Sequence, residues 1–239
     1  VCESASMLGY NVLIATSNAH DISELQSLVE SNRVDGMLLT RALEDDRALQ
    51  YLSQVNFPTA LTGTCRYDNI IQVDTDNEGA AEKMTTLLIG KGFRRFAFLV
   101  KDMSYNVDHK RHEGFCRALI KNGISEKDQL FYNGSIRMEF LDAIIENIIS
   151  KKVECIICGD DEICTMVMSR LQAEGYRIPK DVAIASLYNS INLDCYSPAV
   201  TAVSVAASQM GGAAVRQLIQ RLRGENYEKK TMLDYDILF

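Results

Sequence analysis

Short apolar runs alternate with amphipathic segments along the whole chain, and this alternation limits the possible folds more than any other feature. Residues 96–100 and 154–158 are apolar almost throughout, as strands of a parallel sheet are when helices cover both of its faces. The segments between such runs carry apolar residues at spacings of three and four, which is the period of a helix. The chain is therefore predicted to have an α/β fold built on parallel sheets.

The alternation predicts more strands than one twisted open sheet usually holds, so two sheets are expected. The predicted strands cover residues 11–16, 34–40, 59–62, 70–73, 96–100, 129–132, 154–158 and 182–187. The predicted helices cover residues 21–32, 44–54, 78–91, 111–122, 139–150, 163–175 and 209–223. Asp76 or Asn77 is placed to cap one helix. Because open parallel sheets bind ligands at the carboxyl ends of their strands, any site is expected there.

Composition excludes several classes of protein. The formal net charge of −7 argues against nucleic acid held by this segment alone, since phosphate contacts need clustered Lys and Arg. No apolar run approaches the length that spans a bilayer. The seven cysteines are an odd number and suggest a reducing compartment rather than a disulfide framework. Cys155 and Cys158 lie on one predicted strand, where they point to opposite faces and cannot share a metal.

Four stretches, in this order and spacing, carry a specific resemblance that covers essentially the whole chain. They are VDGMLL at 34–39; DNEGAA at 76–81 with GFRRFAF at 92–98; RHEGF at 111–115; and GDD at 159–161 with GYRIPKDVAI at 175–184 and SPAVTAV at 197–203. Together they resemble the effector-binding domain of the LacI/GalR family of bacterial transcription regulators.

The resemblance implies two Rossmann-like lobes of the type I periplasmic-binding-protein-like fold, with a small polar effector, such as a sugar or sugar derivative, between them. The first lobe is expected to hold residues 1–75 plus 205–226, and the second 76–204 plus 227–239. Residues 1–10 resemble only the tail of the family's first helix, so a helix-turn-helix that binds operator DNA is expected upstream. The family also implies a cytoplasmic homodimer, most often a repressor.

The resemblance places four residues against the effector: Arg111, Asp160, Tyr188 and Asn189. A guanidinium can donate paired hydrogen bonds to vicinal hydroxyls, a carboxylate or a phosphate. The alternative for Arg111, which is expected to open its helix, is a surface ion pair with Glu113 or a neighbouring acid. Asp160 could accept bonds from the ligand or only cap a helix, a role that Asp161 can also fill. Tyr188 and Asn189 replace the family's usual acids, which leaves a modified sugar, a phosphorylated compound or a nucleoside-like ring open.

Enzyme chemistry is not expected. The chain has no glycine-rich phosphate loop, no dinucleotide fingerprint and no nucleophile elbow, so no catalytic residue and no cofactor is predicted. His109 and His112 lie three residues apart but are better explained as a solvated helix start than as a metal pair. The main alternative function is an extracytoplasmic solute-binding protein of a sugar transporter, and a second is the same sensor fused to a different DNA-binding or kinase module.

Overall fold

The computed structural model describes residues 1–16, 21–134 and 138–239, and this part of the chain divides into two compact units. The first unit holds residues 1–75, 104–106 and 206–234, and the second holds 76–103, 107–205 and 235–239. The expected lobes differ from these units for residues 104–106, 205 and 227–234. The strand β9 (Lys230–Leu233) pairs in parallel with β3 (Ile71–Thr75), and this backbone pairing holds it in the first unit.

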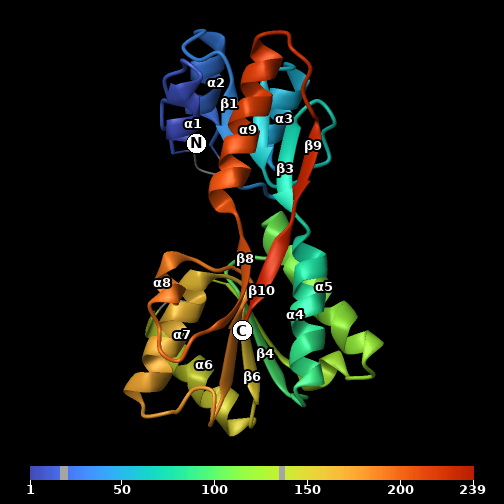
Figure 1. Cartoon of the computed structure of the whole chain (residues 1–239), viewed down its shortest axis with the longest axis vertical. Coiled ribbons are helices and arrows are strands. Elements are labelled where there is room, and N and C mark those ends of the chain that lie inside the picture. The colour runs from blue at the N-terminus through green and yellow to red at the C-terminus, as the bar shows by residue number, and fades with distance from the viewer. Residues whose placement is uncertain (17–20, 135–137) are drawn as a thin grey trace. The chain divides into compact units, whose positions relative to one another are not determined.

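The first unit is a four-stranded parallel sheet with helices on both faces (Figure 1). Its strand order is β1 (Met37–Leu39), β2 (Thr59–Thr62), β3 and β9. Helix α9 (Ala207–Leu222) packs on one face through residues such as Ala214 and Leu218. Helix α3 (Arg47–Gln54) contributes two fully buried residues: Leu49 lies in a cluster with Leu61 of β2, and Leu52 in a cluster with Leu25. The remaining helices are α1 (Cys2–Met7), which packs on α9, and α2 (Ser23–Glu30).

The strand expected at residues 11–16 does not form. A strand needs a neighbour for its backbone groups, and β1, at this sheet's edge, pairs with β2 alone. Leu13 and Ile14 consequently stay 61% and 79% exposed. The sequence pattern identified a segment suited to a sheet, but a pattern does not supply the partner strand.

The second unit is a six-stranded sheet whose two faces are covered by different helices (Figure 1). Five strands are parallel, and the sixth, β10, runs antiparallel to β8. The strand order is β10 (Tyr235–Leu238), β8 (Thr201–Val205), β7 (Ala183–Ser186), β6 (Cys155–Cys158), β4 (Phe96–Val100) and β5 (Leu130–Asn133). The helices are α4 (Asn77–Gly90), α5 (Asn106–Lys121), α6 (Met138–Ser150), α7 (Asp161–Ala173) and the short α8 (Ile191–Asp194) and η1 (Glu126–Asp128).

The buried side chains of β6 alternate between these two faces, as predicted. Cys155 packs with the side chains of α4 and α5, including Phe115, whereas Cys158 packs with those of α6 and α7. Phe98 of β4 stacks on Phe115 with ring centroids 4.8 Å apart. The prediction that Cys155 and Cys158 are core residues on opposite faces is confirmed.

Local signals also placed several helix ends correctly. The Asp76 carboxylate caps α4 by accepting a hydrogen bond of 2.8 Å from the Gly79 amide. After that helix, Gly92 adopts φ +103°, a conformation that costs most other residues free energy. Gly114 has a different role, because a Cβ there would lie 2.1 Å from the Glu78 carbonyl oxygen. Its missing side chain lets α5 approach α4 closely.

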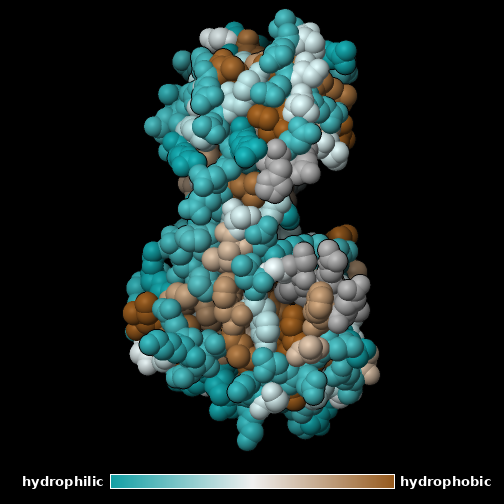
Figure 2. Space-filling model, turned by 180° about the vertical axis from the view of Figure 1, so that it is seen from behind, coloured by the Kyte–Doolittle hydropathy of each residue, from teal (hydrophilic) through white to brown (hydrophobic). Residues whose placement is uncertain are grey.

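On the face drawn in Figure 2, hydrophobic residues appear as brown patches within a largely teal surface. Within residues 1–16, 21–134 and 138–239, no helix has the length and apolar character needed to cross a membrane.

Candidate functional site

The candidate site lies at the carboxyl edge of the second unit's sheet. Strands β7, β6 and β4 are adjacent and parallel, so the residues that follow them emerge at the same edge. Lys101 follows β4, Gly159 and Asp160 follow β6, and Tyr188 follows β7. This is the edge at which open α/β sheets bind ligands.

Arg111 reaches this edge from helix α5. Its side chain is buried, with 8% exposure, and its Nη1 donates a 2.7 Å hydrogen bond to the carbonyl oxygen of Gly159. The helix begins at Asn106 rather than at Arg111, so the expectation that Arg111 opens it is wrong. Burial of Arg111 contradicts a pair at the surface, and the Glu113 carboxylate lies 3.6 Å from His109.

Asp160 caps the helix that follows β6. Its Oδ1 accepts a 2.9 Å hydrogen bond from the amide of Ile163, and its backbone is extended as a cap requires. Asp161 is instead the first residue inside α7, so the role proposed for it belongs to Asp160. The second oxygen of Asp160, Oδ2, lies 3.0 Å from Nζ of Lys101, and both oxygens are therefore engaged.

Lys101 was missed by the sequence reasoning. Its ammonium contacts the carboxylates of both Asp160 and Glu162. Burial opposes the charge of Lys101, but the hydrogen bonds to Glu162 and Asp160 outweigh burial and raise the pKa of the ammonium. The available signal was its position, directly after a buried strand at the ligand edge of the sheet.

The loop after β7 carries the other two predicted residues. Tyr188 is half-buried, and its carbonyl oxygen accepts a 2.6 Å bond from the Ser186 hydroxyl, which fixes the loop's direction. Asn189 donates from Nδ2 to Oδ1 of Asp194 at 2.9 Å. Tyr188 thus lies at the carboxyl edge of the sheet, while the Asn189 amide ties this loop to α8.

The histidines of α5 do not form a metal centre with the residues the structure describes, where no group of three or more His, Cys, Asp or Glu side chains is suitably clustered. His112 packs against Phe131 with ring centroids 4.3 Å apart, and its Nε2 lies 3.5 Å from the Cys116 sulfur. Burial lowers the pKa of His112 and raises that of the Cys116 thiol to about 11. Both groups are therefore neutral at pH 7, as an apolar contact between helix and sheet requires.

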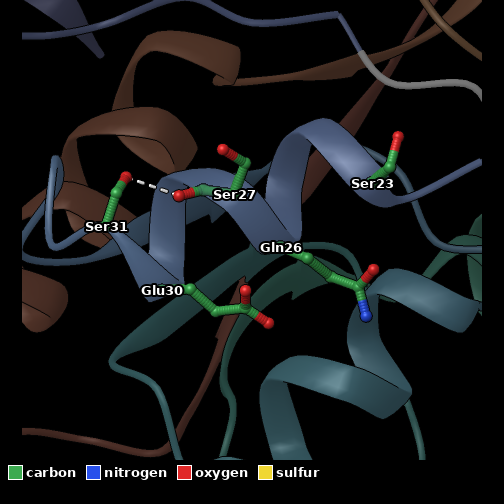
Figure 3. A pocket seen from close by; sticks show the side chains of 5 residues that line it. All are labelled: Ser23, Gln26, Ser27, Glu30 and Ser31. Carbon is green, nitrogen blue, oxygen red and sulfur yellow. Dashed lines mark hydrogen bonds between the residues drawn. The ribbon is translucent and has the colours of Figure 1, made fainter.

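A surface hollow of about 400 Å³ lies elsewhere, on helix α2. Figure 3 shows that its labelled side chains do not converge on a common point: Gln26 and Glu30 extend to one side of the helix and Ser23 and Ser27 to the other. Ser31 bonds back to the carbonyl oxygen of Ser27. Polar groups that point apart on one helix do not surround a ligand, so the carboxyl edge remains the candidate site.

Comparison with protein families gives a match over residues 85–236 to the family described as the periplasmic binding protein-like domain. This match covers the larger part of the chain, including β4, β6 and β7 and the candidate site between residues 101 and 189.

Individual relatives are transcription regulators. The regulator CelR of Thermobifida fusca is 25% identical over 226 residues, which are 92% of this chain and 66% of CelR. The chain thus spans just under two thirds of that relative. A structure assigned to a LacI transcriptional regulator of Bacillus cereus subsp. cytotoxis NVH 391-98 has a TM-score of 0.90 and 28% identity, with 99% of this chain and 86% of that chain covered.

A structure of a CelR–cellobiose complex shares the fold, with a TM-score of 0.87 at 24% identity over 100% of this chain and 75% of that chain. The resemblance seen in the sequence is confirmed by these matches, and so is the α/β fold of the periplasmic-binding-protein-like type.

Proposed function

The chain belongs to the periplasmic binding protein-like domain family, and from this premise we propose that it is the effector-sensing domain of a LacI-type transcription regulator. One observation carries the proposal. At the carboxyl edge of a parallel sheet, Arg111 bonds to Gly159 and Lys101 contacts the next residue, Asp160. Cationic donors held rigidly at such an edge are suited to bind a ligand rich in oxygen acceptors.

The ligand we propose is a small polar molecule of the sugar class. Arg111 supplies a fixed fork of donors for neighbouring hydroxyls, and Tyr188 supplies an aromatic ring and a hydroxyl at the adjacent strand end. The solved complex of CelR with cellobiose makes cellobiose a natural first probe. In this proposal Asp160 positions Lys101, and Asn189 shapes the loop that carries Tyr188.

In the complete protein, ligand binding would be transmitted to a helix-turn-helix segment that binds operator DNA. Such coupling requires that the ligand bind one conformation of a homodimer better than another, and the usual magnitude is about 1 to 3 kcal/mol. A transcription regulator acts in the cytoplasm. The relatives are named as regulators rather than enzymes, which supports a binding role.

The second candidate is a solute-binding protein of a transporter, which has the same fold. The regulator is favoured by the names of the relatives and by all seven cysteines being free thiols, as a reducing compartment requires. Repression of a reporter gene by the complete protein, relieved by the same sugar that binds this domain, would support the regulator. If loss of the complete protein abolished uptake of the sugar but left transcription of the reporter gene unchanged, the result would support the solute-binding protein.

The experiment that tests ligand sensing is a thermal-shift measurement with neutral sugars, sugar phosphates and nucleosides. A ligand present at about 100 times its Kd stabilises the folded state by about 2.7 kcal/mol, which is a rise in Tm of about 5 to 11 °C for a chain of this length. The Arg111→Ala variant should lose this rise. Arg117→Ala is the matched control, since Arg117 lies on the same helix but is exposed and paired with Glu78. Equal shifts in both variants would exclude Arg111 from the site.

A further inference from the structure

Lys101 occupies a position that the stability of helix α7 does not explain. Its ammonium lies against Asp160 and Glu162, the cap and the second residue of that helix. The N-terminal end of a helix carries partial positive charge, which disfavours a cation. Two carboxylates offset this effect, but an uncharged residue at 101 would have avoided it. The charge of Lys101 is therefore better explained by a second role at the sheet edge itself.

The donor count of Lys101 leaves capacity for a further partner. An ammonium has three N–H donors, and the carboxylates of Asp160 and Glu162 each take one. The side chain of Lys101 is 27% exposed, compared with 15% for Asp160. The two carboxylates thus hold the Lys101 ammonium in place, and its third N–H is available to a ligand because the side chain is partly exposed.

The same contacts change what Asp160 presents to a ligand. One carboxylate oxygen is taken by the Ile163 amide at 2.9 Å and the other by Lys101 at 3.0 Å. Beside the end of β6, the Lys101 ammonium therefore adds a donor next to a carboxylate whose two oxygens each already have a partner. Arg111 adds a second donor group. Its 2.7 Å hydrogen bond to the carbonyl oxygen of Gly159, the residue before Asp160, holds it in place.

We propose that Lys101 is a ligand-contacting residue that selects an uncharged oxygen acceptor, such as a sugar hydroxyl, and that Asp160 acts as its positioning residue. This inference rests on the proposed sensing function and deepens it. The acceptor is uncharged because Lys101 already faces two carboxylates. A phosphate placed at the same nitrogen would face the Asp160 and Glu162 carboxylates, whose two charges exceed the single charge of Lys101. This repulsion raises the free energy of binding of the phosphate.

The test compares Lys101→Met, which removes the donor but keeps the length of the side chain, with Lys101→Arg, which keeps a cation. Lys121→Met is the control, because Lys121 is exposed and pairs with Glu82 on the neighbouring helix α4. Binding of cellobiose, glucose and glucose 6-phosphate is measured by calorimetry on the folded domain. Removal of one hydrogen bond from a charged donor should weaken binding of the neutral sugar about 10-fold to 100-fold. Lys101→Arg should recover most of that loss, and Lys121→Met should bind as the wild type does.

Three results would overturn the inference. Unchanged sugar affinity in Lys101→Met would show that Lys101 is structural only. A preference for the phosphate that disappears in Lys101→Met would show that the residue selects an anion. A wild-type domain that binds none of the probes would contradict the proposed sensing of sugars, and the role of Lys101 would fall with it. If Lys101→Met does not fold by circular dichroism, Lys101→Gln, which keeps a neutral donor, takes its place with the same expected direction and a smaller loss.

Discussion

Replacement of Gly114 by alanine should destabilise the second unit by forcing α5 away from α4. The added Cβ would lie 2.1 Å from the Glu78 carbonyl oxygen, about 0.9 Å closer than the 3.0 Å that real Cβ atoms keep, and 3.0 Å from the Ala81 Cβ. Because the obstructing oxygen belongs to the backbone of a helix, it cannot rotate away. Overpacking of this kind costs about 1 to 3 kcal/mol, so the Tm should fall by about 2 to 12 °C.

The matched control is Gly90→Ala at the end of α4, where no atom lies within 4 Å of the new Cβ. Alanine is favoured over glycine in a helix by up to about 1 kcal/mol, so this variant should melt at or above the wild-type temperature. The assay is urea unfolding followed by circular dichroism, together with thermal melting. Since Arg111 lies one turn before Gly114 on α5, ligand affinity should also fall in Gly114→Ala. Equal stability of Gly114→Ala and the wild type would refute the close packing of the two helices.

Three further predictions concern the core, the thiols and pH. Leu141→Ala, at a fully buried position, should cost about 2 to 5 kcal/mol in urea unfolding, whereas Phe140→Ala, at an exposed neighbour, should change stability by less than about 0.5 kcal/mol. Iodoacetamide should alkylate Cys155 after the two exposed cysteines, because burial raises the pKa of its thiol; equal rates, read by mass spectrometry, would contradict its burial. Hydrogen bonds from Arg177 lower the pKa of Asp181 to about 2, so its stabilising effect is complete above the ordinary pKa and is lost as pH falls toward 2. The difference in urea midpoint between wild type and Asp181→Asn should shrink over that range, and a constant difference would contradict the pairing.

The sequence predicted most of the elements because strand and helix periods were each consistent over their full length. Strands β2 and β4 were predicted with the bounds they have: β4 is an apolar run, and β2 is a short run that begins and ends with the β-branched residue threonine. The segment at 11–16 has the same pattern, but it forms no strand. Strand formation depends on a neighbour, and that information is not contained in a local pattern. The pairing of β9 with β3 likewise joins segments that are distant in the chain.

The candidate site residues came from the resemblance, and their contact with a ligand stays a prediction. The resemblance pointed to Arg111 and Asp160, and the structure links both to the end of β6. Lys101 was not foreseen because its contacts join the end of β4 to the start of α7, where Asp160 and Glu162 lie. A lysine after a strand is ordinary by itself, and only the adjacency of β4 and β6 makes it part of the site.

The most direct test of ligand sensing at the carboxyl edge is hydrogen exchange measured by mass spectrometry, with and without a sugar found in the thermal-shift experiment. A ligand held there should slow exchange in the segments after β4, β6 and β7, at residues 101–111, 159–163 and 187–190. Helix α2, with the hollow shown in Figure 3, should serve as the internal reference. Protection of the three segments, absent in Arg111→Ala, is the predicted result. Protection confined to α2, or none at any of the three segments, would contradict the account.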